Sequence, residues 1–176
     1  MNSLSNIDIE KICEQLNLPL RGVYSKDLLP KDLQEGYYII NLTDHRNSAM
    51  GHWTGFYFSS ASQSRGKGIE ENWGVRGAHP SLYFDSFGFV PPKEIEIIFS
   101  PDYVYNAKQI QDITSSACGF FCIAFIAYTS RGCERSPNFK KQNRKPSRVD
   151  FQSFCDLFSK DTKVNDINLF QFLSAL

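Results

Sequence analysis

Residues 109–130 read QIQDITSSACGFFCIAFIAYTS, and a polar approach changes there into the most apolar stretch of the chain. Between residues 117 and 128 only Gly119 interrupts the apolar run, which predicts a helix buried on all sides. The run is too short to cross a bilayer, so it indicates a core helix. Ser115 and Ser116 are favourable N-cap residues, because their hydroxyl oxygens accept hydrogen bonds from N–H groups of the first turn.

Cys118 lies where the polar approach meets this predicted helix. In the first turn of a helix, the positive end of the macrodipole stabilises a thiolate and lowers the pKa of a cysteine. The position therefore predicts a reactive thiol. We interpret Cys122, one turn further along, as a core residue. Gly119 is interpreted as a position where the missing Cβ leaves room for a substrate backbone beside the nucleophile.

The composition is that of a soluble globular protein with a single domain, residues 1–176, long enough to bury a sizeable core. Nineteen basic and 19 acidic residues give a net charge of zero, so no overall charge draws the chain to nucleic acid or a membrane. The first residues have neither the basic region nor the apolar core of a signal peptide. We therefore expect a protein that is not secreted and does not contact a membrane.

The five cysteines, at positions 13, 118, 122, 133 and 155, indicate reduced thiols in an intracellular setting. Their number is odd, and neither a C-x-x-C pair nor a secretory signal is present. Cys118 and Cys122 could share a metal on one helix face, but no second Cys or His pair stands at ligand spacing. We expect no metal site and no required cofactor, and we interpret Cys13 and Cys155 as small core residues.

The hydrophobic pattern predicts mixed α and β elements in one domain. Apolar residues at 9, 12, 13 and 16 predict an amphipathic helix after a cap at Ser5 or Asn6, and residues 20–26 are interpreted as a loop. Strands are predicted at 37–42, 52–58 and 82–85 and around Val104. Further helices are predicted at 91–98, 149–158 and 166–176, a helical turn at 27–33, and a long surface insertion at 59–80.

A cysteine nucleophile needs a base, a group that orients the base, and donors for the oxyanion. Of the three histidines, His45 and His79 lie in polar loops and are interpreted as solvated. His52 begins a predicted strand, where its imidazole can be aimed at a thiol, although a histidine in that position can also be purely structural. Asp85 ends a neighbouring apolar strand, and its carboxylate could fix the tautomer of the imidazole.

Gln111 stands seven residues before Cys118, on the loop that leads into the predicted helix. Its side-chain amide could join the backbone N–H of Cys118 as a donor to an oxyanion. Taken alone, the same residue is better interpreted as an ordinary surface glutamine.

A basic run follows the central helix and is formed by Lys140, Lys141, Arg144, Lys145 and Arg148. These five positive charges have no acidic residue among them. The simpler interpretation is a solvated loop, and the alternative is contact with an anionic partner such as DNA.

Taken in order, these residues resemble the adenovirus-type (adenain-like) cysteine proteases, including relatives in virophages, Polinton-type elements and other double-stranded DNA viruses. The resemblance covers about residues 5–130 in the same order. It rests on the segments Gly51-His52-Trp53, Tyr83-Phe84-Asp85-Ser86-Phe87-Gly88-Phe89 and 111–122, with support from 22–26 and 39–41.

The resemblance implies that Cys118 is the nucleophile, His52 the general base and then acid, and Asp85 the residue that orients the histidine. Gln111 would be the oxyanion-hole side chain, and Trp53 would lie beside the substrate. The implied fold is α+β, with a mixed, largely antiparallel sheet packed against a central buried helix that bears the cysteine. This fold is shared with the deconjugases of ubiquitin-like modifiers.

Members of this family cleave viral capsid and core precursor proteins, commonly after small residues such as glycine. The resemblance therefore implies such precursors as substrates and a monomeric enzyme in the infected host cell, in the cytoplasm or nucleus, and in the virion. Stimulation by DNA through the basic run is a further expectation. The alternatives are a deconjugase of ubiquitin-like modifiers and a non-catalytic binding module on the same fold.

Three departures from the family pattern stand out. The acid is Asp85, where the adenoviral enzymes carry glutamate, so its reach is shorter by one methylene. The insertion at 59–80 lengthens the interval between histidine and acid. Residues 102–108 contain no cysteine that could receive a disulfide-linked activating peptide, so peptide activation is not expected.

Overall fold

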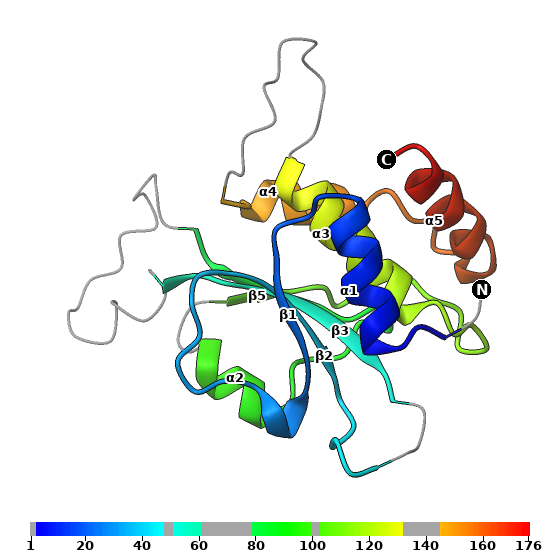
Figure 1. The fold of residues 1–176 in the computed structure, drawn as a ribbon. Helices are drawn as coiled ribbons and strands as arrows, with labels where there is room; N and C mark the ends of the chain where they lie inside the picture. The colour runs from blue at the N-terminus through cyan, green and yellow to red at the C-terminus, as the bar shows by residue number, and fades with distance from the viewer. Residues whose placement is uncertain (1–2, 48–50, 61–78, 100–102, 132–144) are drawn as a thin grey trace.

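A mixed five-stranded sheet organises the part of the chain that the computed structural model describes, residues 3–47, 51–60, 79–99, 103–131 and 145–176 (Figure 1). The strands lie side by side in chain order. They are β1 (Leu20–Ser25), β2 (Gly36–Asn41), β3 (Trp53–Phe58), β4 (Ser81–Phe84) and β5 (Tyr103–Tyr105).

The strand directions agree with the α+β expectation and refine it. β2 pairs antiparallel with β3, and β3 pairs antiparallel with β4. β1 joins β2 in parallel, and β5 joins β4 in parallel. The described sheet is therefore divided evenly between the two kinds of pairing, and the expectation of a largely antiparallel sheet was too strong.

The helices occur close to their predicted positions. They are α1 (Asn6–Gln15), α2 (Lys93–Phe99), α3 (Cys118–Arg131), α4 (Arg148–Cys155) and α5 (Asn165–Ser174), with short 3-10 helices at Lys26–Leu28 and Thr162–Val164. Ser5 is the N-cap of α1 and forms a capping box with Asp8. The predicted loop at 20–26 is wrong, because residues 20–25 form β1 and Lys26 begins the first 3-10 helix. The predicted insertion at 59–80 lies almost entirely outside the described residues.

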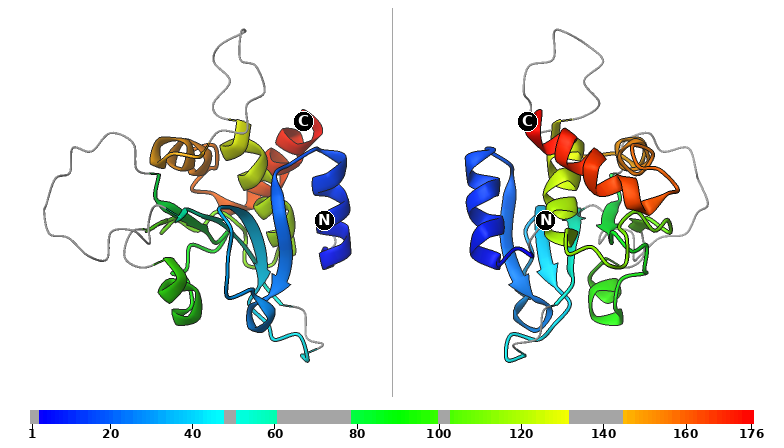
Figure 2. Two further views of the ribbon diagram at one scale, coloured as in Figure 1. Left: turned by 60° about the vertical axis from the view of Figure 1, so that its left-hand side comes forward. Right: turned by 90° about the vertical axis from the view of Figure 1, so that its right-hand side faces the viewer.

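Helix α3 packs on one face of the sheet and is surrounded by α1, α4 and α5, whereas α2 covers the opposite face (Figure 2). Eleven of the fourteen residues of α3 are buried, as the apolar run predicted. Gly55 of β3 lets the helix approach closely, since a Cβ there would lie 3.1 Å from the Phe125 ring. Among the described residues, no helix is long and apolar enough to cross a membrane.

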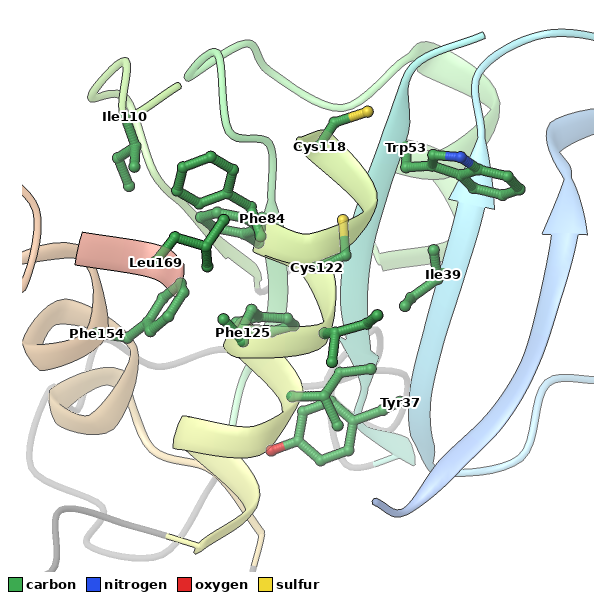
Figure 3. Packing of buried hydrophobic residues seen from close by; sticks show 14 of the residues in the cluster. Tyr37, Ile39, Trp53, Phe84, Ile110, Cys118, Cys122, Phe125, Phe154 and Leu169 are labelled. Atoms are coloured by element: carbon green, nitrogen blue, oxygen red, sulfur yellow. The ribbon is translucent and has the colours of Figure 1, made fainter. Parts of the chain in front are cut away.

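Aromatic rings fill the core between α3 and the sheet (Figure 3). Phe125 of α3 stacks on Phe84 of β4 with ring centroids 5.4 Å apart, and Phe154 of α4 packs against both rings. Cys118 lies at the end of this core, and Cys122 lies one turn deeper. The apolar body of α3 is thus held from several sides, and the first turn of the helix is fixed at the edge of the sheet.

Candidate active site

The first turn of α3 carries Cys118, a thiol that is only 6% exposed. Burial alone would raise its pKa, but the pKa is lowered overall. A hydrogen bond with the His52 side chain and the backbone N–H groups of Trp53 and Gly119 stabilise the thiolate and outweigh the effect of burial. The helix end and the start of β3 therefore both face the sulfur.

His52 immediately precedes β3, and its imidazole bridges Cys118 and Asp85. Its Nε2 lies 2.8 Å from Oδ1 of Asp85, and its ring stacks on Phe87 with centroids 4.7 Å apart. Burial would lower the pKa of His52, but the hydrogen bonds with Asp85 and Cys118 raise it to about 9. Because Nε2 is engaged by Asp85, Nδ1 is the ring nitrogen left to face the thiol.

The opposite pKa shifts describe a charged pair. A lowered pKa at Cys118 and a raised pKa at His52 mean that each charged group favours the other, the thiolate with the imidazolium. This state is the one in which a cysteine is a ready nucleophile and its partner a ready acid.

Asp85 follows β4 directly and is fully buried. Its Oδ1 also accepts a hydrogen bond from the backbone N–H of Phe87, at 2.7 Å. Asn106 holds the backbone of Asp85 from both sides, because its Oδ1 accepts from the Asp85 N–H and its Nδ2 donates to the Asp85 carbonyl, at 2.9 and 2.6 Å. Asn106 follows β5 and was missed in the sequence. The only signal for it was a polar residue placed directly after a strand.

Gln111 is buried, with 1% of its surface exposed, which differs from an ordinary surface glutamine. Its Oε1 accepts a hydrogen bond from the Ser86 hydroxyl at 2.6 Å, and its Nε2 donates to the Ser115 carbonyl at 2.7 Å. These two contacts fix the orientation of the amide and use one of its two N–H groups. The second N–H is the one that could reach an oxyanion.

The turn after Asp85 ties the acid to the loop that carries Gln111. The Ser86 carbonyl accepts hydrogen bonds from the backbone N–H groups of Ile110 and Gln111, at 2.8 and 2.9 Å. Gly88 closes the turn with a φ of +78°, and a Cβ there would lie 2.7 Å from the backbone of Lys108. Ser86 thus contacts Gln111 through both its backbone and its side chain.

Trp53 and Gly119 lie against the N-terminal segment of the chain. The indole N–H of Trp53 donates to the Leu4 carbonyl at 2.9 Å. A Cβ on Gly119 would meet the Leu4 side chain at 3.3 Å and Ile9 at 3.4 Å. The structure thus gives Gly119 a packing role, and substrate contact at Gly119 stays a prediction.

A cleft of about 580 Å³ opens beside Trp53. One wall is the N-terminal segment from Ser3 to Asn6, and the other is formed by β1 with Asn41, His45 and Gly51. Gly51 and Trp53, the residues on each side of His52, belong to the lining of this cleft, whereas His52 and Cys118 do not.

The remaining titratable residues of interest have other partners. His45 hydrogen-bonds to Asp27, and Nδ1 of His79 lies 2.9 Å from the Pro146 carbonyl, so neither is simply solvated. Burial raises the pKa of Cys13 and of Cys155 to about 12 and raises that of Cys122. Cys118 differs from all three. No group of three or more potential metal ligands occurs within the described ranges.

The basic run is described only in part. Lys140, Lys141 and Arg144 lie outside the described residues. Lys145 pairs with Glu35 at 2.7 Å, and Arg148 begins α4. Glu35 precedes β2 at the end of the sheet remote from His52, as the β2–β3 register requires. Contact with DNA at this run stays a prediction.

Compared with known proteins, the chain matches no family model and no curated protein.

Proposed function

We propose that this chain is a cysteine endopeptidase of the adenovirus type, which matures viral capsid and core proteins by cleaving their precursors. The observation that carries the proposal is the connected set of Cys118, His52 and Asp85, in which the thiol and the imidazole have opposite pKa shifts. A buried acid, an imidazole and a thiol in this order are the parts that a thiol protease needs.

In the proposed reaction, the Cys118 thiolate attacks the carbonyl carbon of the scissile peptide bond. A carbon–sulfur bond forms, and the electron pair of the C=O bond moves to oxygen. Asp85 keeps the imidazolium of His52 oriented during the attack. The lowered pKa of Cys118 favours the thiolate, which is the form that attacks.

The tetrahedral oxyanion would be held by the backbone N–H of Cys118 and by the second N–H of Gln111. The Ser86 hydroxyl and the Ser115 carbonyl hold the Gln111 amide in one orientation before substrate arrives. A donor placed in advance in a buried site stabilises developing charge without a cost of reorganisation.

His52 then gives its proton to the leaving amine, and the C–N bond breaks to leave a thioester on Cys118. Water, deprotonated by the now neutral His52, attacks the thioester and releases the new carboxyl terminus. The thiolate and the imidazolium are restored together.

The viral role rests on the resemblance over residues 5–130, and the packing of the cysteine helix on a mixed sheet is compatible with it. By the same resemblance, the substrates are capsid and core precursors cut beside small residues such as glycine. The enzyme acts as a monomer in infected cells and virions. Binding of DNA by Lys140, Lys141, Arg144, Lys145 and Arg148 would modulate the reaction.

The test is incubation of the purified full-length chain with the major capsid precursor, with and without DNA, followed by mass mapping of new termini. A ubiquitin-like conjugate is run in parallel. Cys118→Ala is the inactive variant, and Cys155→Ala is the matched control, since Cys155 is a buried thiol with a raised pKa.

Cleavage of the precursor by the wild type and the Cys155 variant, and not by the Cys118 variant, is the expected result. Cleavage of the conjugate alone would replace the proposal with a deconjugase. Undiminished cleavage by Cys118→Ala, or binding of either protein without any cleavage, would contradict the enzyme assignment.

A further inference from the structure

Three buried oxygens next to the candidate site have no hydrogen bond of normal geometry to any described residue. They are Oγ1 of Thr54, the phenol oxygen of Tyr83 and Oδ2 of Asp85. All three residues are 0% exposed. A buried polar group without a partner costs about 1–3 kcal/mol, and a charged one more, so three such oxygens in one place require an explanation.

The three side chains lie on one face of the sheet. The β3–β4 register pairs Gly55 with Phe84 and Phe56 with Tyr83. Continued by one residue past the end of β4, the same register brings Thr54 opposite Asp85. Tyr83 precedes Asp85 by two residues, so the alternation of a strand directs both side chains to the same side. Tyr83 packs with Phe99 of α2, which identifies this side as the face opposite α3.

The groups are close enough to influence one another. Burial raises the pKa of the Tyr83 phenol, the nearby Thr54 hydroxyl offsets part of this rise, and the charges of Asp85 and of Cys122 on α3 add to it. Cys122 also interacts with the charge of Asp85. The other carboxylate oxygen of Asp85 is already engaged by His52 and by the Phe87 N–H. Oδ2 is the oxygen of Asp85 that has no donor among the described residues.

We propose that Thr54, Tyr83 and Asp85 bind one internal water molecule, which holds the carboxylate of Asp85 from the face of the sheet opposite Cys118. The water donates to Oδ2 of Asp85 and accepts from both hydroxyls. A buried water in a protein makes about three hydrogen bonds to groups that otherwise lack partners, which matches the three oxygens here.

Thr54 and Tyr83 are therefore positioning residues that act through Asp85. Their effect on catalysis rests on the proposed function. The donors stabilise the buried carboxylate as an anion. If they are lost, Asp85 orients the His52 imidazolium less firmly, so the Cys118 thiolate is less stable and is lost at a higher pH as the pH falls.

A high-resolution crystal structure of the full-length chain tests the water site directly, whatever the chain catalyses. A water molecule within hydrogen-bond distance of all three oxygens is expected. Direct hydrogen bonds from either hydroxyl to Asp85, or hydroxyls that turn away from Asp85, would overturn the proposal. Absence of cleavage would contradict the proposed function alone, because the water site does not depend on it.

The positioning role is tested by the pH dependence of Cys118 alkylation, measured by peptide mass in Thr54→Val and Tyr83→Phe. Both variants should move the acid limb to higher pH and slow alkylation at pH 5 several-fold. Thr54→Ser keeps a hydroxyl at position 54, and Tyr37→Phe removes a buried phenol that pairs with Thr129 on the α3 face. Both controls should match the wild type. Folding of each variant is verified by thermal unfolding. A wild-type pH profile of alkylation in folded Thr54→Val or Tyr83→Phe would overturn the proposed water site.

Discussion

Replacement of Asp85 by asparagine removes the charge that holds His52 as an imidazolium while keeping the shape of the side chain. In the wild type, the pKa of His52 is raised from 6.5 to about 9, although burial opposes the rise. At about 1.4 kcal/mol per pH unit, the surroundings favour the imidazolium by about 3 kcal/mol. A neighbouring carboxylate typically accounts for about 1–3 pH units of such a shift. In Asp85→Asn the pKa of His52 should therefore fall by at least about 1 unit.

The assay is an NMR titration of the histidine ring nitrogens, with the three histidines assigned by His52→Gln and His79→Gln. Asp27→Asn is the matched control, since Asp27 forms the other Asp–His pair of the described chain and contacts His45. Asp85→Asn should move only the His52 titration, and Asp27→Asn only that of His45. An ordinary pKa for His52 in the wild type, or one unmoved by Asp85→Asn, would refute this account of the site.

Four further predictions concern the residues around this pair. Ser86→Ala removes one of the two hydrogen bonds that orient the Gln111 amide, so kcat on a cleaved precursor should fall about tenfold with KM little changed. A rise in KM with an unchanged kcat would argue against oxyanion positioning. Asn106→Ala leaves the Asp85 backbone N–H and carbonyl unpaired, so the free energy of unfolding measured with urea should fall by about 2–4 kcal/mol. A loss below about 0.5 kcal/mol would contradict the role of Asn106 in holding the Asp85 backbone. Gly119→Ala should destabilise the chain less in a Leu4→Ala background than in the wild type, because the added Cβ meets Leu4 at 3.3 Å. Additive effects in this double-mutant cycle would contradict the contact between residues 4 and 119. Cleavage should fall on the alkaline side as the pH passes about 9, because His52 then loses the proton that it gives to the leaving amine. On the acid side, cleavage should fall only below the ordinary thiol range, because the pKa of Cys118 is lowered. A rate of cleavage that rises through pH 9 would exclude the ion pair of Cys118 and His52.

The central helix could be predicted from sequence because nearly every position of α3 is buried, so the apolar run and the helix coincide. β1 could not, because Val23 is its one buried residue and Gly22 and Arg21 read as loop. The parallel pairings of β1 and β5 also escaped prediction, since strand direction depends on contacts between segments far apart in the chain.

The candidate site was predicted from residue types and order, and its geometry was not. His52 and Asp85 meet because the register of β3 and β4 places their ends together, which no local pattern encodes. Ser86 and Asn106 were missed because single polar residues at strand ends are common. The packing of Leu4 on Gly119 joins residues more than a hundred positions apart.

Limited alkylation at pH 6 tests the central claim most directly, because it reports the nucleophile without requiring the natural substrate. Peptide mass mapping then measures the rate at each of the five cysteines. The lowered pKa of Cys118 and the raised pKa of Cys13, Cys122 and Cys155 predict that Cys118 is labelled at least about tenfold faster than these three. We expect Cys133 to lag behind Cys118 as well. Labelling of Cys118 at the same rate as the other thiols would contradict the account.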